Sequence, residues 1–282
     1  MTSVAPAVAP PSRSKLPSPR SWAPRILNRR VLILWSLRLA VAAVIIVLWQ
    51  LAPASLVPAV AVGRPGGVVA SIWHLITSGQ IFSAFGSTAL TIAYSIVIGA
   101  PAGALLAILT SLPGLRWVLQ PIVNVTYAIP KVALITLYIL FLGVSVRTHV
   151  LFVVTAVVFI YYFSVRQSLD EIDQSRLTAL RLMGAGWVKV TTSLLIPSSI
   201  PQLLAATRIA LPLAFVSEIF AELRVPTSSG LGVLLNTDAT NLDGASSMAM
   251  LLIITLIAYL LDVFLRGRLQ SFTESNGVGF QL

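Results

Sequence analysis

Long apolar runs separated by short polar segments are the main pattern along this chain. A helix needs about 20 predominantly apolar residues to cross the hydrocarbon core of a bilayer. Runs of about this length occupy residues 31–52, 88–112, 118–143, 149–165, 200–223 and 247–265. The pattern therefore predicts an all-α, polytopic membrane protein with six transmembrane helices.

The composition agrees with a surface that faces lipid. Hydrophobic residues make up 57% of the chain and charged residues only 10%, whereas a soluble domain carries about 25% charged residues. The chain has no cysteine, which excludes disulfides and thiolate metal sites. Its only histidines, His74 and His149, fall in or beside loops, and we interpret both as ordinary polar residues. No catalytic residue and no metal site is predicted.

The distribution of basic residues predicts the topology. Lysine and arginine are concentrated in the N-terminal segment and in alternate loops, while the other loops contain only Arg64, Arg147 and Arg224. Because cytoplasmic loops carry the excess of basic residues, both termini are predicted to be cytoplasmic. The net charge of +10 then reflects topology, and membrane lipid rather than nucleic acid is the expected partner.

Three segments follow from this pattern. Residues 1–29, rich in Pro, Ser, Ala and Arg, are predicted to form a disordered, basic cytoplasmic tail. Residues 30–268 form the six-helix transmembrane domain, and residues 269–282 a second cytoplasmic tail. The apolar run from Val31 is longer than the core of a signal peptide, so an uncleaved first helix is expected.

A polar insert, residues 168–199, separates the fourth and fifth predicted spans. Ser168 followed by Glu171 is a capping-box pattern that predicts a helix start. Gly184 and Gly186 predict a turn, a second short helix runs from Trp187 to Leu195, and Pro197 marks the entry into span five. Such a helix-turn-helix suits docking to a cytoplasmic partner, although an amphipathic helix on the lipid surface would show a similar pattern.

The spacing within this insert resembles a known motif. The permease subunits of bacterial ABC importers carry a cytoplasmic loop of the form E-A-A-x3-G-x9-I-x-L-P. The corresponding positions here are Thr178, Ala179, Leu180, Gly184, Leu194, Ile196 and Pro197. Thr178 replaces the usual Glu and Leu180 replaces the second Ala, so the usual charged contact is absent. By this resemblance, residues 168–199 form the coupling loop that docks on an ATPase.

Two further segments are similar to the nitrate, taurine and sulfonate branch of that family. They are YAIPKVALITLYILFLG at 127–143, with Thr136 at a usual Pro, and the AEL and GLGVLL elements within 207–235. The resemblance, from 88 to 268, implies a type I ABC importer permease-like fold in the bacterial plasma membrane. It also implies a second permease copy in a homodimer, two ABC ATPase subunits and an extracytoplasmic solute-binding protein. This chain has no G-x-x-x-x-G-K-[ST] phosphate loop, so ATP and Mg are expected in the partner subunit and no cofactor in this chain.

Polar residues inside the predicted spans indicate a translocation pathway, because such residues usually face a cavity or a partner. At about 100° per residue, one face of span five carries Arg208, Leu211, Phe215, Glu218 and Glu222 within an arc of about 80°. Span three adds Lys131 after Pro130, where a kink would free a carbonyl. The predicted pathway residues are Lys131, Pro130, Arg208, Phe215, Glu218 and Glu222. Lys131 either forms an ion pair with Glu218 or contacts the solute, and the sequence leaves both alternatives open.

The sequence thus indicates the permease subunit of an ATP-driven, binding-protein-dependent importer of a small, anionic solute, and not an enzyme. An ion-coupled secondary transporter that works without an ATPase is the alternative; inverted repeats would support it, and we see none. The one-sided polar stripe argues against a purely structural membrane subunit.

Overall fold

The computed structural model describes residues 29–51, 63–112 and 114–275. The chain divides into two compact units, Met1–Leu48 and Trp49–Leu282. In the first unit the structure describes most of helix α1 (Arg29–Leu51), which carries apolar residues on all its faces, as expected of a helix surrounded by lipid. The predicted tail of residues 1–29 lies outside the described residues apart from Arg29.

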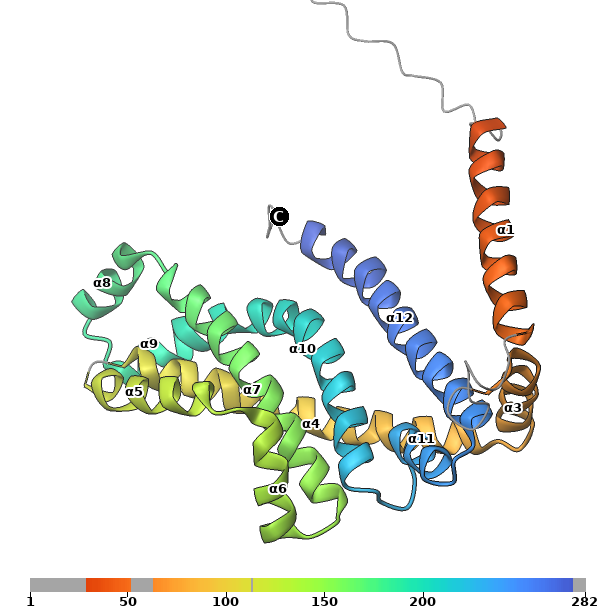
Figure 1. The fold of residues 1–282 in the computed structure, drawn as a ribbon. Coiled ribbons are helices and arrows are strands. Elements are labelled where there is room, and N and C mark those ends of the chain that lie inside the picture. The colour runs from red at the N-terminus through yellow and green to blue at the C-terminus, as the bar shows by residue number, and fades with distance from the viewer. Residues whose placement is uncertain (1–28, 52–62, 113, 276–282) are drawn as a thin grey trace, which may run out of the picture. The chain divides into compact units, whose positions relative to one another are not determined.

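The described part of the second unit is helical and contains no strand (Figure 1). Its elements are α3 (Pro65–Thr77), α4 (Gln80–Ser111), α5 (Leu115–Ala128), α6 (Lys131–Leu142), α7 (Val146–Asp170), α8 (Gln174–Leu182), α9 (Trp187–Val190), the π-helical turn η1 (Thr191–Leu195), α10 (Ile196–Arg224), α11 (Leu231–Thr240) and α12 (Gly244–Ser275). Helix α12 continues to Ser275, into the segment predicted as a C-terminal tail.

Among the described residues, five helical segments are long and apolar enough to cross a membrane, and a sixth span results if α5 and α6 are counted together. The all-α, polytopic prediction is therefore confirmed. The third predicted span, however, is not one straight helix, because α5 and α6 meet at an angle of 95°. Ile129 and Pro130 have extended backbone at the break. The ring of Pro130 disfavours helical geometry at the residue before it, which ends α5 there.

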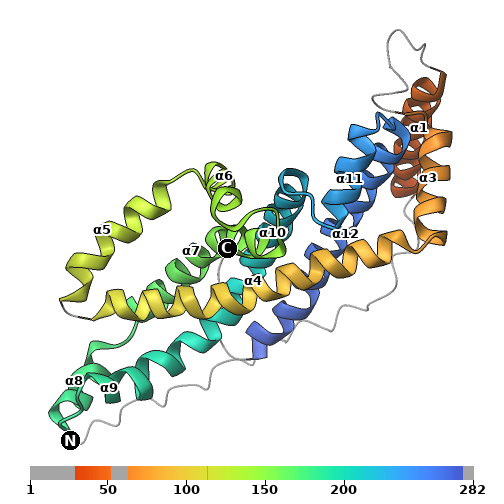
Figure 2. The ribbon, with the colours of Figure 1, turned by 90° about the horizontal axis from the view of Figure 1, so that it is seen from below.

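The core of the second unit is formed where α4, α7 and α10 pack together (Figure 2). Gly99 and Gly103 of α4 lie directly against α7: a Cβ atom on Gly103 would lie 2.5 Å from the Val158 carbonyl oxygen. Helix α10 presents the buried small residues Ala206, Ala210 and Ala214. Small residues allow helix backbones to approach closely, which is how helices associate in a membrane without a hydrophobic driving force between them.

The start of the polar insert differs from the prediction. Helix α7 continues through Ser168 to Asp170, so Ser168 and Glu171 do not begin a helix. Extending an existing helix costs less than nucleating a new one, and the capping-box pattern is overridden. Helix α8 begins later, where the Asp173 carboxylate accepts a hydrogen bond of 2.8 Å from the Ser175 N–H. Hydrogen bonds from Ser175 hold the pKa of Asp173 below its ordinary value.

Pro197 lies in the first turn of α10, where the entry into span five was predicted, but it does not interrupt the helical backbone, which runs from Trp187 to Arg224. A proline in a helix removes an N–H donor and clashes with the carbonyl four residues earlier. Here the turn before it is widened into a π-helix, in which the Ile196 N–H donates to the Thr191 carbonyl. This widening accommodates Pro197 within the first turn of α10.

Candidate functional site

The corner of the predicted coupling loop (residues 168–199) is closed by a Schellman motif at the end of α8. Gly184 has a positive φ of 78°. Its N–H donates to the Arg181 carbonyl at 2.9 Å, and the Ala185 N–H donates to the Leu180 carbonyl at 3.0 Å. A Cβ atom on Gly184 would meet nothing within 4 Å. The glycine is therefore required for its left-handed backbone and not for close packing, which explains its fixed spacing after Leu180.

The inner face of α8 packs against the rest of the unit. Leu177 and Leu180 contact a buried cluster that includes Val190 and Leu195. The leucine at position 180 thus fills the base of the loop, where the related motif has a smaller alanine. Because Val190 and Leu195 belong to the helical segment that leads into α10, this packing joins α8 to the base of α10.

The outer face of the loop is apolar and exposed. Leu182 is 84% exposed and Met183 74% at the end of α8, and Val188 of α9, on the other side of the corner, is 79% exposed. The Arg181 guanidinium lies over the Trp187 ring, 4.7 Å from its centroid, which links α8 to α9. Large exposed apolar side chains in a polar segment are typical of a docking surface.

The motif residues of the loop fall in two groups, one on α8 and its corner and one at η1 and the start of α10. Thr178 and Ala179 are exposed on α8, Leu194 is half-buried in η1, and Ile196 and Pro197 are exposed at the start of α10. The motif therefore covers the corner at Gly184 and the helical segment that leads from it into α10.

The polar stripe predicted on α10 is found, but its two carboxylates are buried inside the protein. Glu218 is 0% exposed and Glu222 1%, and Phe215 is buried. Arg208 is half-buried. The carboxylates thus bind other parts of this chain in this structure and do not face an open pathway.

Glu222 caps the N-terminus of α11. One carboxylate oxygen accepts a hydrogen bond of 2.7 Å from the Thr88 hydroxyl, and the other accepts one of 2.7 Å from the Gly232 N–H. The Leu231 N–H donates to the Thr88 hydroxyl oxygen at 3.0 Å. These contacts satisfy N–H groups that a helix start leaves free, and a negative group is favourable at that end of the helix dipole.

The glycines of the GLG element make room for this cap. A Cβ atom on Gly230 would overlap the Glu222 carboxylate, and one on Gly232 would lie 2.7 Å from the Ile219 carbonyl oxygen. The AEL and GLG elements of the segment 207–235 are therefore two halves of one contact. Helix α11 itself, and α3, lie in segments where no helix was predicted.

Glu218 pairs with His149 and not with Lys131. His149 Nδ1 lies 3.0 Å from Glu218 Oε1, and His149 Nε2 lies 2.7 Å from the Val225 carbonyl oxygen. His149 lies at a helix boundary, in the first turn of α7, but its interpretation as an ordinary polar residue is wrong, since its side chain is 2% exposed and bonded on both nitrogens. Two features of the sequence could have indicated this buried pair: a histidine at the edge of one apolar run, and a carboxylate inside another.

Lys131 contacts aromatic rings and a carbonyl. Its Nζ lies 4.7 Å from the centroid of Tyr127 and 5.2 Å from that of Phe159, and 3.5 Å from the Tyr127 carbonyl oxygen. Lys131 and Glu218 do not form the ion pair that was one of the two alternatives left open. Span three is bent by 95° at Pro130 and is not the straight helix that was expected. The carbonyl that Pro130 frees, that of Thr126, accepts from the Ile129 N–H instead.

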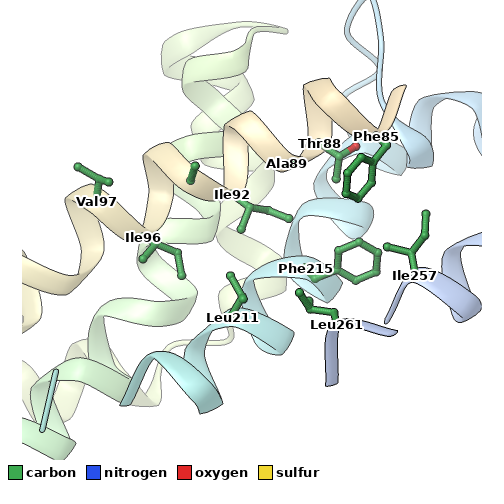
Figure 3. A pocket seen from close by; sticks show the side chains of 11 residues that line it. Phe85, Thr88, Ala89, Ile92, Ile96, Val97, Leu211, Phe215, Ile257 and Leu261 are labelled. Atoms are coloured by element: carbon green, nitrogen blue, oxygen red, sulfur yellow. The ribbon is translucent and has the colours of Figure 1, made fainter. Parts of the chain in front are cut away.

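A cavity of about 350 Å³ lies between α4, α10 and α12 (Figure 3). Its lining includes Phe85, Ile92, Leu211, Phe215, Ile257 and Leu261. The one hydroxyl group in the lining, that of Thr88, already bonds Glu222 and Leu231. The cavity therefore offers an ion no free polar partner. Within the described ranges no three His, Asp or Glu side chains are grouped so as to hold a metal.

Comparison with known proteins gives matches over most of the chain. Residues 99–269 match the family model described as "Binding-protein-dependent transport system inner membrane component". A Bacillus subtilis (strain 168) protein named as an aliphatic sulfonates transport permease, SsuC, is 25% identical over 82% of this chain and 84% of its own length. The taurine transport system permease protein TauC of Escherichia coli (strain K12) is 24% identical over 76% of this chain and 75% of its own length.

Among solved structures, a chain of the MetNI methionine ABC transporter in an inward-facing conformation has the same fold. The TM-score is 0.51 at 22% sequence identity, and the match covers 69% of this chain and 96% of that chain.

Proposed function

We propose that this chain, which belongs to the family of binding-protein-dependent transport system inner membrane components, imports a small anionic solute of the sulfonate or taurine type. In this proposal separate subunits bind ATP and Mg and hydrolyse ATP. The observation that carries it is the exposed coupling loop, closed at Gly184 and packed on the base of α10.

The coupling loop is suited to transmit motion because it is continuous with a long helix. Helical backbone covers residues 187–224, which at 1.5 Å per residue is about 57 Å. This exceeds the hydrocarbon thickness of about 30 Å. A force applied by an ATPase on Leu182 and Met183 would thus reach Glu222 and the start of α11. We infer two ATPase subunits, one for each copy in a homodimer.

The anionic character of the solute is inferred from Lys131. Lys131 is the first of twelve residues in α6, about 18 Å from the far end of that helix. Phe159, which its ammonium group contacts, lies thirteen residues into α7 from Val146, or about 20 Å. Both distances, measured from the ends of α6 and α7 that the loop at 143–145 connects, place the Lys131 ammonium group near the middle of the bilayer. Ionisable side chains at such depths commonly mark a solute pathway.

Lys131 also lacks a carboxylate partner among the described residues. Its positive charge is stabilised by the faces of Tyr127 and Phe159, which are weaker partners than an anion. The relatives named for aliphatic sulfonates and taurine support the same solute class. With both termini cytoplasmic, a solute-binding protein would deliver this anion to the opposite side of the bacterial inner membrane.

Reconstitution tests the proposal directly. The permease, its ATPase and its solute-binding protein would be placed in proteoliposomes, and uptake of labelled taurine and of an alkanesulfonate would be measured with and without ATP. We expect ATP-dependent uptake of one of these anions. Uptake that needs no ATPase and stops when an ionophore dissipates the ion gradient would support a secondary transporter instead.

A further inference from the structure

The His149–Glu218 contact joins three segments of the chain in a site without exposure to solvent. His149 belongs to the first turn of α7, Glu218 to α10, and Val225 to the turn between α10 and α11. All three residues are 2% exposed or less. A buried polar group must find its partners within the protein, so the protonation of this site is constrained by its geometry.

The carbonyl oxygen of Val225 can only accept, so His149 Nε2 must carry a hydrogen. His149 Nδ1 then has two options toward Glu218 Oε1. It accepts from a protonated carboxyl group, or it donates as part of an imidazolium ion. In both cases the pair holds one shared proton and has no net charge.

The second carboxylate oxygen, Glu218 Oε2, is buried and makes no hydrogen bond with any residue that the structure describes. A full negative charge would spread over both oxygens and leave Oε2 without compensation. Oε1 is therefore the one carboxyl atom through which the described residues hold the shared proton.

We propose that His149 is a positioning residue for transport: it fixes the turn between α10 and α11 against α7 through one proton shared with Glu218. Val225 follows Glu222 by three residues, and Glu222 caps α11. The histidine thus holds the connection that keeps the carboxylate cap in register with the N-terminus of α11. The role in transport rests on the proposed function. The shared proton and the fixed position of the turn are independent of that function.

Nitrogen NMR tests the shared proton. The chain has only two histidines, and His74 is exposed on α3, so a His74→Gln variant labelled with ¹⁵N-histidine reports on His149 alone. We expect a single ring state with hydrogen on Nε2 and a hydrogen-bonded Nδ1. Glu218→Gln, whose amide can still donate to Nδ1, should preserve this state. A ring protonated only on Nδ1, or one that exchanges between tautomers, would contradict the proposal.

Spin labelling tests the position of the turn. The chain has no cysteine, so Ser228→Cys, exposed in the turn, accepts a single nitroxide. The double variant His149→Leu with Glu218→Leu replaces both partners by apolar groups, which can leave stability nearly unchanged. We expect the label to become mobile in the double variant and to stay ordered in Glu218→Gln. Unchanged label mobility in a folded double variant would overturn the proposal.

Transport provides the readout that a purely structural role would not move. In proteoliposomes the double variant should import roughly tenfold less solute per ATP hydrolysed, because the Val225 carbonyl loses its donor, while His74→Gln should match the unmodified protein. Normal import by the double variant would contradict a positioning role. If the unmodified complex imports nothing, the proposed function fails, and the NMR and spin-label results still decide the role of His149. If the double variant does not fold, the test of His149 is the ring state of His149 that NMR detects in Glu218→Gln.

Discussion

At the scale of single residues, the backbone of Gly184 is the feature on which the coupling loop depends most directly. Its φ of 78° is a conformation that costs other residues roughly 1–2 kcal/mol, and a β-branched residue is the least suited to it. The Schellman hydrogen bonds from Gly184 and Ala185 would weaken together.

We therefore predict that Gly184→Val leaves the protein inserted in the membrane but reduces ATPase binding and abolishes uptake. Co-purification with the ATPase and solute uptake in vesicles measure the two effects. Gly186→Ala is the matched control, because Gly186 has a φ of −72° and open space around it. Normal uptake by Gly184→Val would argue against the assignment of this loop.

A second prediction at this scale separates the two roles first considered for Lys131. Since Glu218 bonds His149 and Lys131 contacts Tyr127 and Phe159, Lys131→Met should fold and bind its ATPase normally but fail to import the anion. Lys131→Arg should keep part of the uptake because the positive charge remains.

A double-mutant cycle between Lys131→Met and Glu218→Gln should show no coupling in stability beyond about 0.5 kcal/mol. The measurement is thermal unfolding in detergent for the four proteins of the cycle. A larger coupling would mean that the two side chains form an ion pair in the assembled transporter.

At the scale of elements, the Glu222 cap on α11 depends on the absence of a side chain at Gly232. Gly232→Ala should destabilise the protein by roughly 1–3 kcal/mol, because its Cβ would lie 2.7 Å from the Ile219 carbonyl oxygen. Gly86→Ala, exposed in α4 with nothing within 4 Å, should be neutral or stabilising by up to roughly 1 kcal/mol. The melting temperatures of the two variants in detergent test the difference.

The elements also show how far the sequence could be interpreted. The long apolar helices were predictable because each satisfies its own backbone hydrogen bonds and needs only length and hydrophobicity to be recognised. The apolar run of 149–165 thus identified α7, which extends from Val146 to Asp170. Pro130 was correctly identified as a point of disruption, but the 95° angle depends on how α6 packs against α7.

Contacts between distant segments were not predictable from local pattern. Thr88, Glu222 and Gly232 meet at one helix start although Thr88 and Glu222 are 134 positions apart. The pattern left a Lys131–Glu218 pair open and missed His149 as the partner of Glu218 for the same reason, because it does not show which helices are neighbours. The corner at Gly184 was predictable, since its spacing and its positive φ arise within six residues.

At the scale of the whole molecule, the proposed topology predicts which positions a reagent can reach. Asn241 and Leu182 are both exposed, and the chain has no cysteine of its own. In intact cells a membrane-impermeant maleimide should label Asn241→Cys from outside and leave Leu182→Cys unlabelled. Leu182→Cys should react only after the membrane is opened. Labelling of both positions in intact cells would place both on the outer side of the membrane and would overturn the topology.

The glycines of α4 restrict how this protein can change shape. Gly99 and Gly103 fit against Val157 and the Val158 carbonyl group with no space for even a methyl group. Even the Cβ atom of an alanine carried to either contact point would collide with α7. We therefore expect α4 and α7 to move together as one rigid body in the bilayer. We therefore expect movement of this pair relative to the rest of the unit to depend on breaks in the helical backbone, of which the 95° bend at Pro130 is the sharpest described between paired helices.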